Sequence, residues 1–323
     1  MKILITGGAG FIGYHLARVL LQKSIIEEIY IIDNFSRGVM DEDFSRLLEK
    51  EKVHFIQADL KESDALEDVL KMDIDYIFHC AAVCGTRLFY EKPYYTLSNN
   101  LKSTMNIIEA LKDMSDFKIV FTSTSEAYSG NESLSFPTQE LTRLSIADVF
   151  NPRWSYAGSK IVGEQLFIHG AKKYDFRYSI IRFHNIYGER MGYEHVVPGV
   201  IKRIFEKQDP FEVFGKKETR SFCYVEDAVE ALWRVAISDK TDGKIVNIGR
   251  SKETEIGDIY KNLFDISGFN PKEILYKTSP KGSTKRRYPD VSFLKSSTGY
   301  ECKTGLYEGL LKTWDWYKRK LNQ

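Results

Sequence analysis

The chain begins with the feature that most restricts its fold, a glycine-rich turn between a short apolar run and a helical pattern. The opening residues read MKILITGGAGFIG, in which Gly7, Gly10 and Gly13 follow the apolar run 2–6. That run is typical of a buried parallel strand, and the segment 11–22 is typical of a helix. Glycine permits positive φ and lets the backbone approach a ligand. Because a helix N-terminus favours an anion, the turn predicts a site for the pyrophosphate of a dinucleotide.

Apolar runs and helical patterns continue to alternate through the first half of the chain. We predict strands at 28–33, 53–60, 74–80, 118–121 and 177–183, a helix over about 97–112, a loop over 131–151 and a helix that opens at Pro152. This alternation predicts a doubly wound parallel sheet, which binds ligands at the carboxyl ends of its strands. The expected fold class is therefore α/β, a Rossmann-type doubly wound parallel sheet with a smaller C-terminal α/β substrate domain.

Beyond Glu189 the elements become shorter and more mixed. We expect a helix at 198–207, strands at 211–214 and 219–225, a helix at 226–237, a strand at 244–248 that returns to the main sheet, and a final helix from about 306. We expect these short elements to form the smaller domain.

Residues at the predicted strand ends indicate how a dinucleotide is held. Asp33 lies twenty residues after Gly13, where a carboxylate binds both ribose hydroxyls and repels a 2′-phosphate, which favours NAD over NADP. Arg37 weakens that preference, because a guanidinium also pairs with phosphate. Asp59 either contacts the adenine or caps the next helix. The other cofactor-binding candidates are Phe11, Ile12, Asn34, Ser36, Leu60, Ala81, Ala82 and Asn100.

A tyrosine and a lysine lie four residues apart, at Tyr156 and Lys160, on the helix that opens at Pro152. That spacing places both on one helix face. If this face meets the cofactor, the ammonium group stabilises a tyrosinate and lowers the pKa of the phenol toward neutrality, as a general base requires. Two surface residues are the alternative interpretation, since the spacing is common by chance.

Seven motifs together resemble the extended short-chain dehydrogenase/reductase family and, more narrowly, its nucleotide-sugar epimerase/dehydratase branch. They are GGAGFIG, DNFSRG, the strand that ends in HCAA, YAGSK, RFHNIYG, TRSFCYVEDAVEA and RRYPD, in that family's order and spacing. The resemblance implies an NAD-binding Rossmann domain at 1–188 with a return near 223–250. It also implies a nucleotide-sugar-binding domain at 189–222 and 251–323.

The same resemblance implies a reaction that starts with oxidation at the 4-position of the sugar. Tyr156 would take the proton of the 4-hydroxyl, Thr124 would share that hydrogen bond, and Lys160 would hold the nicotinamide ribose. The catalytic candidates are Tyr156, Lys160, Thr124, Ser125 and Glu126, and the substrate-binding candidates are Asn185, Val197, Arg220 and Arg287. Arginine suits a diphosphate because its planar guanidinium binds phosphate with two hydrogen bonds.

Members of the branch differ in the fate of the 4-keto sugar. The sequence from Ser123 to Glu126 resembles GDP-mannose 4,6-dehydratases and UDP-glucuronate decarboxylases, in which the glutamate is a second acid or base. The motifs RFHNIYG and TRSF resemble GDP-mannose 3,5-epimerases instead. We expect NAD-dependent oxidation of a nucleotide sugar, preferably a GDP-manno-hexose or -heptose, to a 4-keto sugar or 4-epimer for capsule or lipopolysaccharide assembly. The alternatives are a 4,6-dehydratase that uses Glu126 and a catalytically silent NAD(H)-binding regulator.

Composition excludes several classes of partner. The 323 residues include 46 Lys and Arg against 45 Asp and Glu, which gives no electrostatic argument for nucleic acid or an anionic membrane. No apolar stretch approaches the ~20 residues of a bilayer helix, and the opening lacks a signal-peptide pattern. Four cysteines predict reduced thiols in the cytoplasm, without a zinc site. The expected partners are a nucleotide-diphosphate sugar and, by resemblance, a second copy in a homodimer. Apolar residues on two helices permit that dimer, although an internal core explains them equally: Met105, Ile108, Leu166 and Phe167.

Overall fold

Short apolar runs form the centre of the molecule, as a parallel sheet of seven strands. The computed structural model describes residues 1–62, 64–67, 71–131, 133–279 and 283–322. The strands are β1 (Lys2–Thr6), β2 (Glu28–Asp33), β3 (Val53–Gln57), β4 (Tyr76–His79), β5 (Lys118–Thr124), β6 (Arg177–Phe183) and β11 (Lys244–Ile248). Their order is β11-β6-β5-β4-β1-β2-β3, and every neighbouring pair is parallel. The order reverses between β1 and β4, where a doubly wound sheet binds its ligand.

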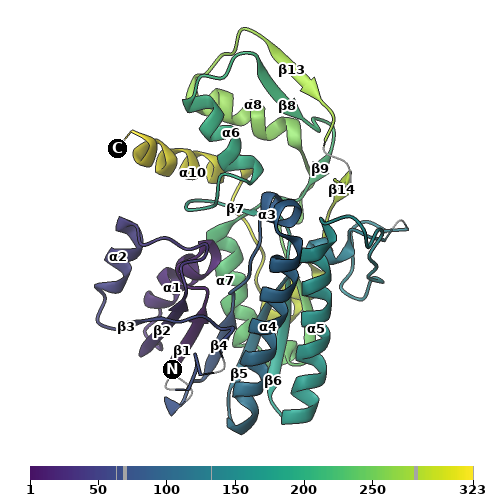
Figure 1. The fold of residues 1–323 in the computed structure, drawn as a ribbon. Helices are drawn as coiled ribbons and strands as arrows, with labels where there is room; N and C mark the ends of the chain where they lie inside the picture. Colours follow the sequence, from purple (N-terminus) through teal and green to yellow (C-terminus); the bar gives the residue numbers. More distant parts are fainter. Residues whose placement is uncertain (63, 68–70, 132, 280–282, 323) are drawn as a thin grey trace.

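Both faces of the sheet are covered, which explains why its strands are apolar throughout. Ile3 and Ile5 of β1 belong to one core cluster, whereas Leu4 between them belongs to another. Helices α4 (Pro93–Ala110) and α5 (Trp154–Tyr174) lie side by side on one face (Figure 1). On the other face α1 (Phe11–Leu21) packs against α7 (Val225–Ala236). The expected Rossmann-type fold is confirmed.

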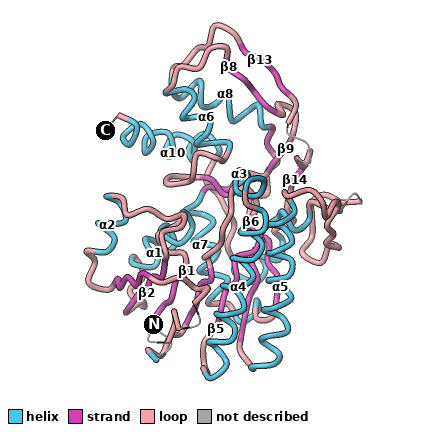
Figure 2. Tube along the Cα trace, viewed as in Figure 1, coloured by secondary structure: helices cyan, strands magenta, loops and turns pink. Residues whose placement is uncertain are grey.

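A smaller lobe lies beyond the carboxyl ends of the strands (Figure 2). Its helices are α6 (Val196–Phe205), α8 (Ile256–Ser267) and α10 (Leu306–Leu321). Its strands form small sheets, β13 (Ile274–Lys277) with β8 (Phe211–Phe214), and β12 (Thr254–Glu255) with β9 (Thr219–Arg220) and β14 (Arg286–Arg287). The pair β7 (Ile186–Tyr187) and β10 (Cys223–Tyr224) joins this lobe to the sheet. The remaining α-helices are α2 (Glu42–Leu48), α3 (Thr86–Glu91) and α9 (Ser292–Thr298). The division into two domains at the boundaries given above stays a prediction.

The structure corrects several element boundaries. The single strand expected at 219–225 is wrong, because β9 and β10 belong to different sheets and residues 221–222 between them belong to neither strand. The helix expected from residue 97 begins at Pro93, since proline is tolerated in a first helical turn. The third strand ends at Gln57 rather than at 60. Sequence analysis also left α8 unassigned, although its pattern is amphipathic.

Two of the residues that were expected to permit a dimer serve the fold instead. Ile108 and Phe167 are buried in the core cluster under α4 and α5, and Met105 is 45% exposed. The homodimer therefore stays a prediction. Among the described residues, no helix has the length and apolar character needed to span a bilayer.

Candidate active site

The glycine turn between β1 and α1 forms a cradle with no room for side chains. Gly7 has φ +69°, and a Cβ there would lie 2.7 Å from the backbone of Ala81. A Cβ on Gly13 would lie 2.5 Å from the carbonyl oxygen of Gly7. The amide of Gly10 donates to that same carbonyl at 3.1 Å, which closes the turn. The backbone at the N-terminus of α1 is thus open to a phosphate group, as the sequence predicts.

A cavity of about 590 Å³ extends from this turn along the carboxyl ends of the strands. Most of the predicted cofactor-binding residues line it: Gly7, Gly10, Phe11, Ile12, Gly13, Asp33, Asn34, Ser36, Arg37, Asp59, Leu60, Ala81, Ala82, Tyr156 and Lys160. Asn100 does not. Its buried amide accepts from the nitrogen of Val83 at 2.7 Å and donates to the Val83 carbonyl at 3.1 Å, so it supports the loop after β4.

Two charged residues at the ribose end of the cavity have different surroundings. Asp33 is buried, and its carboxylate accepts from the amides of Phe35 (2.7 Å) and Ala9 (3.1 Å). Burial raises the pKa of Asp33, and these amides oppose the shift. Arg37 forms an ion pair with Glu194 and donates to the carbonyl of Cys84. Because its guanidinium is held there, the preference for NAD that Asp33 implies is not weakened by Arg37.

Tyr156 lies at the inner end of the cavity, with its ring stacked on Phe89 at a centroid distance of 4.9 Å. Burial raises the pKa of the Tyr156 phenol, whereas a hydrogen bond with Thr124 and the charge of Arg37 lower it. The net direction is opposite to the expectation from the Tyr-x-x-x-Lys spacing. The spacing places the two side chains on one face but does not reveal how deeply the phenol is buried.

Lys160 is also buried, with a relative exposure of 3%. Its Nζ donates to the carbonyl of Thr122 at 2.7 Å and lies 4.6 Å from the ring centroid of Phe121. Burial lowers the pKa of Lys160 to about 8. The ammonium group is therefore held at the end of β5, one residue from Ser123 and two from Thr124.

His79, which sequence analysis interprets as a core residue rather than a catalyst, is fully buried. Its Nδ1 lies 2.8 Å from the Thr6 hydroxyl. Burial, together with the charge of Lys160, lowers the pKa of His79 to about 3, so the imidazole is neutral.

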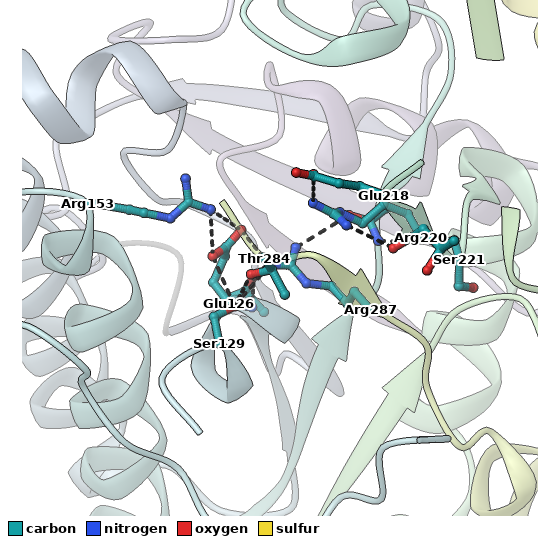
Figure 3. A network of polar contacts seen from close by, with 11 residues as sticks. Glu126, Ser129, Arg153, Glu218, Arg220, Ser221, Thr284 and Arg287 are labelled. Atoms are coloured by element: carbon teal, nitrogen blue, oxygen red, sulfur yellow. Dashed lines mark hydrogen bonds and ion pairs between the residues drawn. The ribbon is translucent and has the colours of Figure 1, made fainter. Parts of the chain in front are cut away.

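Glu126, the last of the catalytic candidates, belongs to a cluster of charged residues that we call the arginine cluster: Arg153, Arg220, Arg287, Glu126 and Glu218 (Figure 3). Its carboxylate lies 3.0 Å from Arg287 and 3.3 Å from Arg153. Burial raises the pKa of Glu126, but the charges of Arg287 and Arg153 outweigh it and hold the pKa at about 2. Glu126 is a carboxylate at any working pH. Thr124, Ser125 and Glu126 all line the cavity.

Arg220 and Arg287 are neighbours on adjacent parallel strands, because β14 pairs with β9 in that register. Arg287 also donates to the hydroxyl of Ser129 at 2.9 Å. Arg220 lies 3.1 Å from Glu218. Burial and the charge of Arg287 lower the pKa of Arg220 to about 10. Two guanidinium groups held side by side in this way are arranged to share one anion.

The four substrate-binding candidates are not equivalent. Asn185 and Arg287 line the cavity, and Arg287 donates to Asn185 Oδ1 at 3.4 Å. Arg220 lies behind Arg287 and is not part of the lining. Val197 is 1% exposed and packs in the core of α6 rather than against the cavity. Its expected role as a substrate contact thus lacks a structural basis.

Several residues that sequence analysis missed close the cavity from the smaller lobe. Arg190 lies 2.7 Å from Asp41 and donates to the carbonyl of Ala9 at 3.1 Å. Trp316 of α10 lines the cavity and donates from its indole to Asp43 at 2.9 Å. Phe89 and Arg153 were missed as well. No local sequence signal marks these residues, because each acts through a partner that is distant in the chain.

Comparison with known proteins supplies the identification. The model of the NAD dependent epimerase/dehydratase family matches residues 3–249. The chain belongs to this family. UDP-N-acetyl-alpha-D-glucosaminuronate decarboxylase of Bacillus cytotoxicus is 31% identical over 334 residues and covers 98% of both chains. The family is one of NAD-dependent enzymes that act on nucleotide sugars as epimerases, dehydratases or decarboxylases.

Solved structures of the family superpose over almost the whole chain. UDP-glucose 4-epimerase of Thermotoga maritima, solved with UDP-glucose, has a TM-score of 0.87 at 26% identity and covers 99% of this chain and 100% of its own. UDP-glucuronic acid 4-epimerase of Bacillus cereus, solved with UDP-glucuronic acid and NAD, has a TM-score of 0.86 at 28% identity, with the same coverage. The cofactor of the family is NAD, and the cradle of this chain fits its pyrophosphate.

Proposed function

We propose that this member of the family oxidises the 4-position of a nucleotide-diphosphate sugar and yields a 4-keto sugar or its 4-epimer. One observation carries the proposal. A phenol, a threonine hydroxyl and a buried ammonium group, those of Tyr156, Thr124 and Lys160, lie in the same cavity as the glycine cradle and Arg287. The cradle accounts for one diphosphate and the arginine cluster for a second.

Tyr156, Thr124 and Lys160 have different roles in the first step, the oxidation at carbon 4. Bound NAD supplies the acceptor for the hydride that leaves carbon 4. Tyr156 takes the proton of the 4-hydroxyl, and Thr124 holds that hydroxyl through a shared hydrogen bond. Lys160 binds the nicotinamide ribose and adds a positive charge close to the phenol. In an epimerase, Tyr156 returns its proton to the oxygen when hydride re-enters from the opposite face.

A nucleotide diphosphate fits the pair Arg220 and Arg287, because its charge offsets the repulsion between the two guanidinium groups. For the base and sugar, the resemblance of RFHNIYG and TRSF to GDP-mannose enzymes makes a GDP-manno-hexose or -heptose the first substrate to test. The names of the relatives above contain UDP instead, so UDP-sugars form the second series. A capsule or lipopolysaccharide precursor is the product that this proposal implies.

The state of Glu126 favours a second candidate, 4,6-dehydration. A 4-ketone acidifies the hydrogen on carbon 5, and removal of that proton requires a base. Glu126 lines the cavity and is held as a carboxylate by Arg287 and Arg153, so it has the protonation state of a base rather than of an acid.

Chromatographic separation followed by mass spectrometry distinguishes these outcomes, because an epimer has the mass of its substrate and is recognised only as a separate peak. Purified protein is incubated with NAD and a panel of GDP-, UDP-, CDP- and dTDP-sugars. A ketone loses two hydrogens, an epimer keeps its mass, a dehydratase product loses water, and a decarboxylase product loses carbon dioxide. We expect a ketone or an epimer. A panel without any of these products would refute the enzymatic proposal.

The variant Tyr156→Phe tests the assignment of the base. It removes one hydroxyl and keeps the ring stacked on Phe89. We expect kcat to fall by about 10³-fold while the dissociation constant of NAD stays within about twofold. The matched control is Tyr14→Phe, on a ring outside the cavity lining, which should keep parental turnover. Parental turnover by Tyr156→Phe itself would show that another group takes the proton.

A further inference from the structure

A third charged residue continues the row formed by Tyr156 and Lys160. Glu164 lies four residues beyond Lys160 on α5, so the three side chains share one face of the helix. The side chain of Glu164 is 4% exposed, and it does not line the cavity. A buried carboxylate costs several kcal/mol unless it is paired and hydrogen-bonded. Glu164 is therefore expected to have buried hydrogen-bond partners.

Glu164 connects α5 to two strands of the sheet. Its Oε1 accepts from the hydroxyl of Ser123 on β5 at 2.5 Å and from Nε of Arg182 on β6 at 2.9 Å. Its Oε2 accepts from Nη2 of Arg182 at 2.5 Å. The guanidinium of Arg182 is itself 2% exposed and donates to the Tyr128 hydroxyl and to the Glu140 carbonyl, both at 2.8 Å. All of these contacts involve Glu164 or Arg182, and all are buried except the partly buried one with the Glu140 carbonyl.

The residue that Glu164 binds on β5 is flanked by the two groups that the reaction uses. Thr122, before Ser123, supplies the carbonyl that accepts from Lys160 Nζ at 2.7 Å. Thr124, after it, supplies the hydroxyl that bonds Tyr156. Because neighbouring residues in a strand move together, a shift of Ser123 along α5 displaces both contacts at once.

We infer that Glu164 is a positioning residue, which fixes the end of β5 against α5 and places a carboxylate one helical turn from Lys160. This inference rests on the proposed function, since it depends on the roles proposed there for Tyr156 and Lys160. The hydroxyl of Ser123 transmits the position. Arg182 orients the carboxylate through two hydrogen bonds, and that carboxylate lies one helical turn from Lys160.

The groups around Lys160 come from three elements. On α5 they are Tyr156 and Glu164, and on β5 they are the carbonyl of Thr122 and the ring of Phe121. At and after the end of β4 they are His79, Cys80 and Cys84. Burial lowers the pKa of Lys160, and Cys84, Cys80 and Glu164 raise it. Burial also raises the pKa of Cys80 to about 12, so this thiol is neutral at working pH.

The experiment compares pH profiles of parent and variants, with the sugar that is turned over in the product panel. Glu164→Gln alone leaves Arg182 buried without its partner and risks unfolding. The test variant is therefore the pair Glu164→Gln with Arg182→Gln. We expect the alkaline limb of kcat, the range in which deprotonation of Lys160 limits turnover, to begin roughly one pH unit lower. The protonated fraction of Lys160 at pH 8 would then fall from about one half to about one tenth, so kcat at pH 8 should fall about fivefold while the KM of the sugar stays within about twofold. Glu164→Asp, which keeps the charge, should retain the parental limb.

The affinity for NAD gives a readout that needs no sugar. Because only a protonated Lys160 donates to the ribose with a full charge, the dissociation constant of NAD should rise above about pH 8 in the parent. In the double variant that rise should begin at lower pH. Isothermal titration at several pH values measures it.

A second buried ion pair on the same strand is the matched control. Lys118, at the start of β5, lies 2.6 Å from Asp242 and is 1% exposed. Lys118→Gln with Asp242→Asn should lower stability and leave both pH profiles unchanged. If the folded Glu164 double variant keeps the alkaline limb of the parent while Tyr156→Phe is inactive, the inference about Glu164 is overturned and the proposed function is not. Normal turnover by Tyr156→Phe overturns the proposed function instead.

Discussion

The two lobes prepare their ligand sites by different means. In the sheet lobe, the backbone of the turn from Gly7 to Gly13 forms the cradle, and a Cβ at Gly7 or Gly13 would collide with main-chain atoms. At the smaller lobe, side chains form the site, and the arginine cluster draws on β9 and the residue before it, on β14, on the N-cap of α5 and on the turn after β5. A backbone site admits one kind of ligand. A site made of long side chains can be altered one residue at a time, which suits a family whose members share NAD and differ in their sugars.

Loss of one guanidinium group tests how much of the affinity for the nucleotide sugar depends on the smaller lobe. For Arg287→Leu we expect the KM of the nucleotide sugar to rise about 100-fold, because a hydrogen bond to a charged group contributes about 1.5–3 kcal/mol. The dissociation constant of NAD should stay within about twofold. Steady-state kinetics and isothermal titration measure the two quantities.

The control for this prediction is Arg286→Leu, the adjacent residue, which pairs with Glu253 outside the cluster. It should keep the parental KM. Equal losses of NAD and sugar affinity in Arg287→Leu would contradict the division of work between the lobes.

The pH dependence tests the part of the site that both ligands share. Burial raises the pKa of Tyr156 above its ordinary value, so the fraction of tyrosinate, and with it kcat, should increase by about tenfold per pH unit from pH 6 toward 8. Lys160 loses its proton above a pKa of about 8, and this loss offsets the gain in tyrosinate, so kcat should level off above that pH. A pH–rate profile with saturating sugar measures both limbs. A profile that keeps rising past pH 10 would exclude Lys160 as the source of the alkaline limb.

Val197 provides the smallest effect and the sharpest contrast with Arg287. It was expected to contact substrate, yet it is buried in the core of α6. Val197→Ala should lower the free energy of unfolding by about 2 kcal/mol through the cavity it leaves. The KM of the sugar should not change. Urea denaturation and kinetics separate the two, and a raised KM with parental stability would restore the original assignment.

The sequence predicted the sheet lobe well because its signals are local. The cradle, the acid at the end of β2 and the Tyr-x-x-x-Lys face each occupy a short stretch, and periodicity placed β6 and β11 at their observed bounds. Fifteen of the cofactor candidates line one cavity for the same reason.

The smaller lobe was less predictable because its elements are defined by distant partners. β9 is two residues long and is defined by its pairing with β12 and β14, so a strand pattern over 219–225 misses the interruption at residues 221–222. The indole of Trp316 donates to Asp43, which lies 273 residues earlier in the chain. The pKa of Tyr156 depends on burial, which no spacing of residues reveals.

The register that places Arg220 beside Arg287 has a consequence for stability as well as for recognition. Like charges held together cost free energy in the folded chain, and a bound diphosphate removes that cost. Nucleotide and fold are therefore thermodynamically linked, and a ligand at 100 times its dissociation constant adds about 2.7 kcal/mol to the free energy of unfolding. Thermal melts in GDP and in UDP measure this gain and rank the two nucleotides without any turnover. The arginine that we propose to bind the diphosphate, Arg287, also neutralises the buried carboxylate of Glu126, so its removal should weaken binding and folding together, a coupling that the cradle of Gly7 does not have.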